Sequence, residues 1–320
     1  MKILVTGSAG FIGFHLSKKL LDLNFTVHGI DNLNLYYDVN LKKNRLLILK
    51  KYKKFSFKKI DIANYKLLNN QFKLNNYDIV INLAAQAGVR NSIDKPRDYL
   101  NSNIIGFFNI LELSKIYKIK HLVFASTSSV YGDNKTFPLK EEYNTDKPLN
   151  FYAASKKSNE VMAYSYSYIH KIKITGLRFF TVYGAFGRPD MALFKFTKLI
   201  KNSKPLKLFN KGNHIRDFTY IDDVTESIIR LINKPSKNKI PFQILNIGSN
   251  KPKRLKEFLK IIEKLLEKKS KPIFLPLQKG DIHKTHADNS KLYKKTNFLP
   301  KTSLNNGIKY FINWYMKYYE

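Results

Sequence analysis

At 320 residues the chain is long enough to bury a large core and to hold two domains, and its 57 Lys and Arg against 24 Asp and Glu give a formal net charge of +33. Because the lysines are scattered over most segments with no recognisable DNA-binding motif, we do not predict nucleic-acid binding, although positive charge can steer an anionic small substrate. The absence of cysteine excludes disulfides, thiolate metal sites and cysteine nucleophiles, and no apolar run reaches the roughly 18 residues of a membrane span.

The first predicted element is a buried strand over residues 2–6, followed by a glycine-rich turn and an amphipathic helix over 15–23. A start this early leaves no room for a signal peptide, so we expect a cytoplasmic protein. Strand, glycine turn and helix form the opening of a dinucleotide-binding unit, whose glycines let the backbone approach a pyrophosphate at the helix N-terminus. The turn carries Gly7, Gly10 and Gly13, a Gly-x2-Gly-x2-Gly spacing that differs from the general Gly-x-Gly-x2-Gly fingerprint.

The second predicted strand covers residues 26–30 and ends in Asp31, 18 residues beyond Gly13. An acid at this place suits a ribose 2′-hydroxyl and repels a 2′-phosphate, which favours NAD over NADP as the cofactor. The alternative is that Asp31 only caps a turn. A third strand over 55–60 leads into Asp61 and Ile62, which we expect to border the adenine.

Strand and helix signals continue to alternate as far as residue 177. The strands are 77–83, 121–125 and 172–177, and the helices are 99–118 and 151–168. This alternation predicts an α/β fold with a doubly wound parallel (Rossmann) sheet, with ligands gathered at the carboxyl ends of its strands. Segments at such ends are the turn at Gly7, Asp31, 84–86, 126–129 and 179–183.

The pattern is less regular after Gly184, with a helix over 191–201 and a short strand over 206–209. We therefore expect an NAD-binding domain over 1–184 and a smaller, mainly substrate-binding domain over 185–320. The helix that opens at 220–224 is expected to pack back on the first sheet, together with the rest of 215–248.

Tyr152 and Lys156 lie four residues apart, which places them on one face of a predicted helix about one turn apart. An ammonium beside a phenol favours the phenolate, so Tyr152 is a candidate base. Because Tyr and Lys are abundant in this chain, a Tyr and a Lys at this spacing can also occur by chance.

His283 and His286 lie three residues apart, but with only aspartates nearby in a predicted loop they indicate no metal site.

Together these residues resemble the extended short-chain dehydrogenase/reductase family and, within it, the nucleotide-sugar epimerases. The glycine spacing is that of the family, and its catalytic Ser/Thr, Tyr and Lys fall on Thr127, Tyr152 and Lys156. Family-like segments follow at 178–184, 216–223 and 280–285. The segments 31–38, with Leu41-Lys42 and Arg45-Leu46 after it, and 187–192 are most similar to the UDP-glucuronate 4-epimerases. One departure is Ala185-Phe186, where those enzymes usually carry Pro-Trp.

The resemblance implies that Tyr152 takes a proton from the sugar 4-hydroxyl while C4 gives a hydride to NAD+, which later returns it to the opposite face. It also implies that Lys156 lowers the pKa of Tyr152 and binds the nicotinamide ribose, that Thr127 bonds the reacting oxygen, and that helices 103–117 and 152–168 form a homodimer. The expected NAD contacts are Gly7, Gly10, Phe11, Ile12, Gly13, Asp31, Asn32, Asp61, Ile62, Leu83, Ala84, Ala85, Gln86, Ser126, Tyr152, Lys156, Phe179 and Val182.

The residues after Thr127 separate the sister reactions. Sugar 4,6-dehydratases place Asp-Glu there and UDP-glucuronate decarboxylases Thr-Ser-Glu, whereas this chain has Ser128 and Ser129, which carry no carboxylate. We hypothesise that Ser128, Ser129 and Thr181, with Arg188, grip the carboxylate of a uronic acid. The alternative is that Arg188 pairs with Asp190 or binds the diphosphate.

The remaining expected substrate contacts are Arg216, Phe209, Gln278 and Asp281. Arg216 is the candidate for the diphosphate, because a guanidinium matches phosphate oxygens with a fork of donors; its alternative is a pair with Asp217 or Asp222. Phe209 is expected to stack on uracil or to belong to the core. The sequence thus predicts 4-epimerisation of UDP-glucuronate to UDP-galacturonate, with UDP-glucose or a UDP-N-acetylhexosamine as alternative substrates, and decarboxylation or a non-catalytic NAD-binding role as further alternatives.

Overall fold

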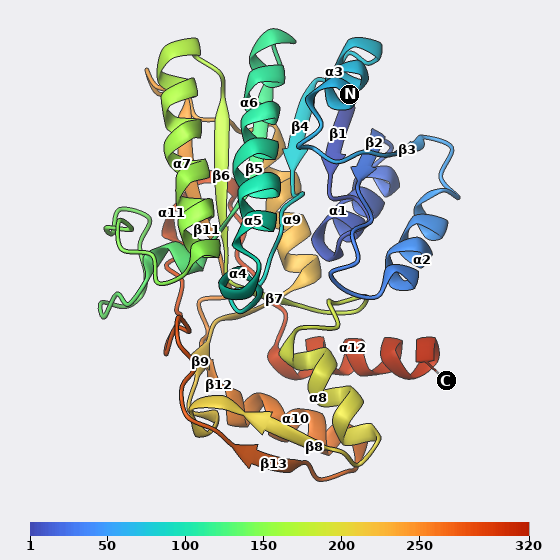
Figure 1. Ribbon diagram of the computed structural model, residues 1–320, viewed down its shortest axis with the longest axis vertical. Helices are drawn as coiled ribbons and strands as arrows, with labels where there is room; N and C mark the ends of the chain where they lie inside the picture. Colours follow the sequence, from blue (N-terminus) through green and yellow to red (C-terminus); the bar gives the residue numbers. More distant parts are fainter. Residues whose placement is uncertain (320) are drawn as a thin grey trace.

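The computed structural model describes residues 1–319, which are built around one seven-stranded sheet (Figure 1). The strand order is β11-β6-β5-β4-β1-β2-β3, and every neighbouring pair is parallel. The predicted doubly wound parallel sheet is therefore confirmed. The order reverses between β1 and β4, and ligands of such sheets bind outside the strand ends at this kind of switch point. The strands are β1 (Lys2–Thr6), β2 (Thr26–Asp31), β3 (Phe55–Lys59), β4 (Ile79–Asn82), β5 (His121–Thr127), β6 (Ile174–Phe179) and β11 (Phe242–Ile247).

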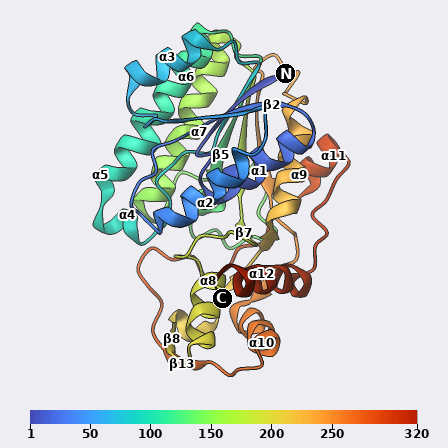
Figure 2. The same ribbon diagram turned by 90° about the vertical axis from the view of Figure 1, so that its right-hand side faces the viewer.

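Helices cover both faces of the sheet (Figure 2). Two separate apolar clusters fill the space between sheet and helices, one on each face, which explains why the central strands are apolar on both sides. On one face lie α1 (Phe11–Asp22), α2 (Val39–Leu49), α9 (Ile221–Ile232) and α11 (Ser290–Thr296). On the other lie α3 (Tyr65–Leu74), α6 (Gly106–Ile116) and α7 (Phe151–His170).

The segment predicted to be helical over 99–118 is helical as far as Ile116, but its first part is π-helical rather than α-helical. The segment consists of α5 (Pro96–Tyr99), a π-helical turn η1 (Leu100–Ile105) and α6, and it is preceded by the short α4 (Asn91–Asp94). A π-helical turn inserts extra backbone into a helix and is frequent at functional sites. Here it holds the buried side chain of Asn103, whose partners lie in two other segments.

Beyond the carboxyl edge of the sheet lies a smaller lobe, at the bottom of Figure 1. Its strands pair as β7 with β10, β9 with β12 and β8 with β13. The elements that have not yet been named are η2 (Ser128–Tyr131), β7 (Thr181–Tyr183), α8 (Ala192–Lys201), β8 (Pro205–Leu208), η3 (Phe209–Gly212), β9 (Ile215–Arg216), β10 (Phe218–Tyr220), β12 (Lys253–Arg254), α10 (Leu255–Leu266), β13 (Lys271–Phe274) and α12 (Leu304–Tyr319).

Between the segments that form the smaller lobe, other segments of the chain pack again on the large sheet. Helix α9 packs against α1, and β11 pairs with β6 as the last strand of the sheet. The division into domains over 1–184 and 185–320 remains a prediction. Within residues 1–319, no helix has both the length and the apolar character needed to cross a membrane.

Candidate active site

A cavity of about 400 Å³ lies along the carboxyl edge of the sheet, between the sheet and the smaller lobe. Its wall contains all the expected cofactor contacts: Gly7, Gly10, Phe11, Ile12, Gly13, Asp31, Asn32, Asp61, Ile62, Leu83, Ala84, Ala85, Gln86, Ser126, Tyr152, Lys156, Phe179 and Val182. It also contains Thr127 and, among the expected substrate contacts, Ser128, Ser129, Thr181, Arg188, Arg216 and Asp281. Phe209 and Gln278 do not line it. The roles of these residues stay predictions, but one space joins nearly all of them.

The glycine turn leaves no room for side chains. Gly7 has a φ of +69°, and a Cβ there would lie 2.8 Å from the backbone nitrogen of Ala84. A Cβ on Gly13 would lie 2.1 Å from the carbonyl oxygen of Gly7. Backbone therefore packs on backbone at the start of α1, and the helix N-terminus faces the cavity as a cradle for an anionic group. This cradle fits the pyrophosphate of a dinucleotide.

Asp31 lies beside this turn with both carboxylate oxygens accepting backbone N–H groups, from Ala9 at 3.2 Å and from Leu33 at 2.8 Å. Burial raises the pKa of Asp31, and the two backbone bonds and the nearby Lys42 act in the opposite direction. The bond to Leu33 is the turn-capping role that was the alternative. Because each carboxylate oxygen has further lone pairs and the group lines the cavity, this role is compatible with a ribose contact.

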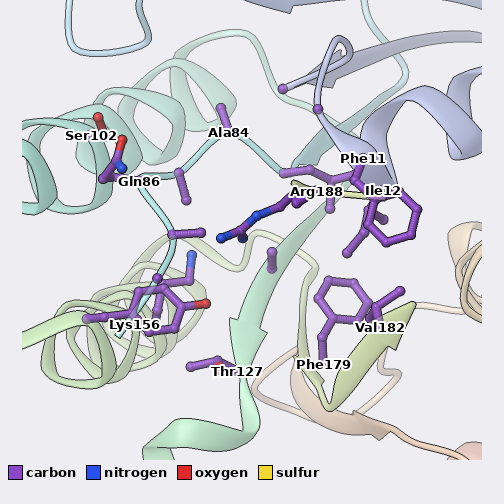
Figure 3. Close-up of a pocket in the computed structure, with 18 of the residues that line it drawn as sticks. Phe11, Ile12, Ala84, Gln86, Ser102, Thr127, Lys156, Phe179, Val182 and Arg188 are labelled. Carbon is purple, nitrogen blue, oxygen red and sulfur yellow. The ribbon is translucent and has the colours of Figure 1, made fainter. Parts of the chain in front are cut away.

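Tyr152 and Lys156 project from the first turns of α7, opposite Thr127 at the end of β5. Asn150 caps α7 by accepting the N–H of Ala153, which fixes where the helix starts. Lys156, Thr127 and Arg188 surround one space in Figure 3. Burial raises the pKa of Tyr152, while the Thr127 hydrogen bond and the Arg188 charge oppose this. The net direction is thus opposite to the one expected from Lys156 alone.

Lys156 is itself buried, and this burial lowers its pKa to about 8, with the Glu160 charge acting in the opposite direction. Glu160 lies one turn further along α7. Its carboxylate accepts a bond of 2.6 Å from Ser126 and two bonds, of 2.9 and 2.8 Å, from Arg178. The bond from Ser126 therefore ties α7 to the end of β5 that carries Thr127, and the buried ion pair with Arg178 ties α7 to β6.

Asn103, in the π-helical turn, is a site residue that the sequence reasoning missed. Its side-chain oxygen accepts the N–H of Gln86, and its amide donates to the Gln86 carbonyl and to the Ser155 hydroxyl. It therefore links the loop after β4 to α7, next to Tyr152. An asparagine inside a helical run is a poor helix former, and that was the one local signal of its role.

Arg188 forms a bidentate ion pair with Asp190, through Nε at 3.0 Å and through Nη2. The hydroxyl of Tyr36 also donates to Asp190, at 3.1 Å, and burial together with Asp190 raises the pKa of Tyr36 to about 12. The pair with Asp190 was the alternative expected for Arg188. The guanidinium still lines the cavity (Figure 3), so the pairing leaves it exposed to a ligand.

Arg216 pairs with Asp281, at 3.0 Å, rather than with Asp217 or Asp222. Asp281 comes from the segment after β13, so this pair joins two strips of the cavity wall. Asp217 does not pair with Arg216, because its buried carboxylate accepts the backbone N–H groups of Ser249, Asn250 and Ala287. It fixes the loops behind the wall instead.

Two expected substrate contacts lie elsewhere. The ring of Phe209, at the start of η3, faces the guanidinium of Arg90 at 4.5 Å. The side-chain oxygen of Gln278 is buried and accepts no hydrogen bond within residues 1–319. Neither residue lines the cavity, and the contact of each with the substrate stays a prediction.

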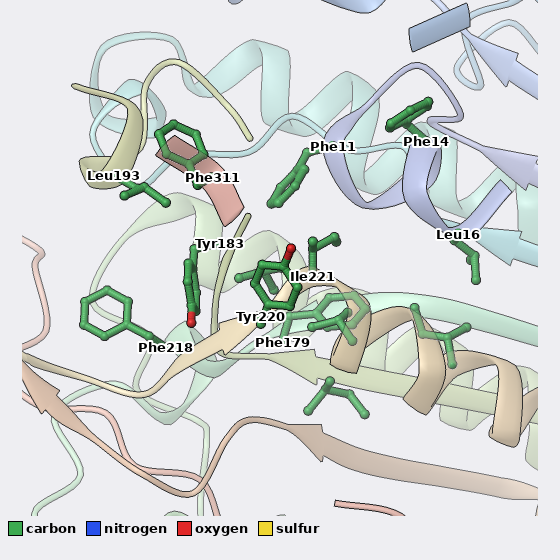
Figure 4. Close-up of a cluster of buried hydrophobic side chains, with 14 of the residues drawn as sticks. Phe11, Phe14, Leu16, Phe179, Tyr183, Leu193, Phe218, Tyr220, Ile221 and Phe311 are labelled. Carbon is green, nitrogen blue, oxygen red and sulfur yellow. The ribbon is translucent and has the colours of Figure 1, made fainter. Parts of the chain in front are cut away.

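Aromatic packing supports the wall on the side of the smaller lobe. In Figure 4, Phe11 and Tyr183 lie in the same buried cluster as Leu193 and Phe311, which belong to the lobe. At the Ala185-Phe186 departure, the carbonyl of Ala185 bonds the His15 ring at 2.8 Å, and the carbonyl of Phe186 accepts from Arg45 at 2.6 Å. The Phe186 ring packs on Trp314, with centroids 4.8 Å apart. Having Ala185-Phe186 in place of Pro-Trp therefore changes packing at this wall and no reacting group.

Within residues 1–319, no group of three or more His, Cys, Asp or Glu side chains is placed to hold a metal ion.

Residues 3–248 match the model of the NAD dependent epimerase/dehydratase family. The chain is 48% identical to Protein CapI of Staphylococcus aureus, over the whole of both chains. It is 44% identical to a UDP-glucuronate 4-epimerase of Thermodesulfobacterium geofontis, covering 97% of this chain and 95% of that one. Among solved structures, the UDP-glucuronic acid 4-epimerase of Bacillus cereus in complex with UDP-glucuronic acid and NAD superposes with a TM-score of 0.92, at 34% identity over the whole of both chains.

Proposed function

The chain belongs to the NAD dependent epimerase/dehydratase family, and from this membership we propose that it interconverts UDP-glucuronate and UDP-galacturonate by inverting C4 of the sugar. The observation that carries the proposal is the single cavity in which Tyr152, Lys156 and Thr127 lie opposite the glycine turn. Relatives named for this reaction are similar to nearly the whole chain, including the smaller lobe.

NAD is the cofactor of this family, and the residues around the glycine turn fit it. The turn, whose glycines have no room for a Cβ, offers backbone N–H groups to the diphosphate, and Asp31 offers carboxylate oxygens to the adenosine ribose. When bound, NAD+ supplies a hydride acceptor for C4 and a positive charge on the nicotinamide ring.

Tyr152 is the proposed base at the sugar 4-hydroxyl. Because burial raises its pKa, the phenolate needs positive charge and donated hydrogen bonds around it. Thr127 and Arg188 already act in that direction, and Lys156, four residues along α7, keeps its ammonium at neutral pH since its pKa is about 8. Loss of the hydroxyl proton to Tyr152, together with loss of the C4 hydride, would give the 4-keto sugar. After this sugar has turned within the cavity, return of the hydride to the opposite face of C4 and of the proton from Tyr152 would give the inverted hydroxyl.

The hydroxyls after Thr127 favour an epimer over an elimination or decarboxylation product. Ser128 and Ser129 line the cavity and carry no acid or base able to take part in loss of water. With Thr181, they offer hydroxyl donors to the uronate carboxylate. Donors to the carboxylate stabilise the negative charge that decarboxylation would move onto the ketone, and they can hold the C–C bond out of alignment with that ketone, so both effects oppose loss of CO2 from the 4-keto acid.

Arg188 is proposed to add selectivity for the acid sugar. Its Nε and Nη2 are taken by Asp190, and the remaining nitrogen, Nη1, is left to face a ligand in the cavity. Replacing Arg188 by Ala is expected to reduce turnover of UDP-glucuronate more than turnover of UDP-glucose. An equal loss on both sugars would remove Arg188 from carboxylate selection.

The decisive experiment incubates the protein separately with UDP-glucuronate and UDP-glucose and identifies the products by NMR. We expect the galacturonate configuration from the acid and no release of CO2. A pentose product would contradict epimerisation, and faster turnover of UDP-glucose would reassign the substrate. Tyr152→Phe serves as the control for the mechanism: turnover should fall by about 10²–10⁴-fold, and full activity would exclude Tyr152 as the base.

We also propose that α6 and α7 pair with a second copy of the chain. Both helices carry apolar side chains that are exposed in the single chain, including Phe108 and Ile116 on α6 and Val161, Tyr164 and Tyr168 on α7. Light scattering on the purified protein measures this directly, and a monomer at micromolar concentration would contradict it. The cytoplasmic location and the absence of nucleic-acid binding remain predictions from the sequence.

A further inference from the structure

Four cationic side chains line the cavity, and three of them have a partner or a proposed role. Arg188 pairs with Asp190, Arg216 pairs with Asp281, and Lys156 stands beside Tyr152. The fourth is Lys42. In the part of the chain that the structure describes, Lys42 has no carboxylate within ion-pair distance.

Lys42 projects from the buried face of α2, with only 4% of its surface exposed. Its ammonium donates to the backbone carbonyl and to the side-chain oxygen of Asn34, both at 2.7 Å. It also lies 4.5 Å from the centre of the Tyr37 ring. An ammonium has three N–H donors, so one remains after the two bonds to Asn34.

The charge around Lys42 is unbalanced. Arg45, three residues along the same buried face, is fully buried, and its hydrogen bonds within residues 1–319 go to the uncharged oxygens of Ala9, Tyr37 and Phe186. Among the described residues, Asp31 is the acid whose charge acts on Lys42, while the charges of Arg45 and Arg188 repel it. Two buried cations against one buried acid leave a net positive charge, which is costly unless an anion is bound there.

The glycine turn beside this charge carries no basic side chain between Gly7 and Gly13. The N-terminus of α1 offers backbone N–H groups and about half an elementary charge. A diphosphate in that cradle carries two negative charges, so the turn alone leaves most of them uncompensated.

We propose that Lys42 is a cofactor-binding residue whose ammonium compensates the diphosphate of the dinucleotide at the glycine turn. The proposal rests on the binding of NAD by this family and does not depend on which sugar is turned over. Asn34 holds the ammonium in place, and its own amide donates to Gln86 at 3.3 Å, which ties this position to the loop after β4.

The test is a calorimetric titration of the full chain with ADP-ribose, ADP and adenosine, comparing the native protein with Lys42→Met. ADP-ribose and ADP share the diphosphate, and adenosine lacks it. We expect the affinity for both diphosphates to fall about tenfold or more, because a charge-assisted contact is lost, and the affinity for adenosine to stay unchanged. The affinity of the variant for ADP-ribose should also depend less on salt concentration.

Lys43 provides the matched control, since it is the next residue on the same helix and is exposed. Lys43→Met should bind all three ligands like the native protein. Equal losses for adenosine and ADP-ribose in Lys42→Met, or an unchanged affinity for ADP-ribose, would overturn the proposal. If Lys42→Met does not fold, Lys42→Gln keeps a donor toward Asn34 without the charge and gives the same comparison. Failure to turn over UDP-glucuronate while ADP-ribose binding follows the expected pattern would count against the proposed function and not against this contact.

Discussion

Replacing Arg178 by Met is predicted to destabilise the protein strongly, although Arg178 does not line the cavity. The side chains of Arg178 and Glu160 are 4% and 6% exposed, and two bonds of 2.9 and 2.8 Å join them. The substitution leaves a buried carboxylate whose one remaining hydrogen bond among the described residues comes from Ser126. Removing one partner of a buried pair costs about 3–5 kcal/mol, a large share of the 5–15 kcal/mol that typically stabilises a folded domain.

Urea unfolding followed by circular dichroism measures this change. The double variant Arg178→Met, Glu160→Gln removes both charges and should recover part of the loss, since no unpaired charge remains buried. Because Ser126 precedes Thr127, turnover by the folded fraction of Arg178→Met should also decrease. A loss of stability below about 1 kcal/mol in Arg178→Met, the value of a surface pair, would refute the reasoning, because it would mean that solvent reaches the carboxylate.

Three further predictions concern the cavity itself. Turnover should decline as pH rises above about 8, because burial lowers the pKa of Lys156 to that value and its ammonium is then lost; a flat pH–rate profile across this range would contradict a role for the charge. The same lowered pKa should reduce folding stability as pH falls from 10.5, the pKa of Lys156 in the unfolded chain, to about 8. Gly13→Ala places a Cβ 2.1 Å from the Gly7 carbonyl, so we expect about 1–3 kcal/mol of destabilisation and loss of bound NAD, measured as nucleotide released from the denatured protein; normal NAD content would show that the turn adapts. Asp190→Asn removes the charge that neutralises Arg188 and should lower the KM for UDP-glucuronate relative to UDP-glucose; parallel changes for both sugars in initial-rate assays would contradict this.

The nucleotide half of the fold could be predicted because its signals are local. The strand at residues 2–6, the glycine turn and Asp31 each report on their own neighbourhood, and the rule that ligands collect at the carboxyl ends of parallel strands then placed them at one edge. The pairing of Arg188 with Asp190 was also within reach, since the two residues are two positions apart. Phe209 was the opposite case, because nothing in its own segment reveals that Arg90 faces it.

The sequence by itself determined the alternation of strands and helices as far as residue 177, the glycine turn and which residue types stand at the strand ends, because hydrophobic period and turn chemistry act over a few residues. The tertiary structure alone decided the partners of the buried polar groups. Arg216 pairs with Asp281, 65 positions away, and Asn103, in a π-helical turn, bonds Gln86 and Ser155. It also decided the sign of the pKa shift of Tyr152, since the desolvation of a buried phenol depends on segments far apart in the chain that close over it.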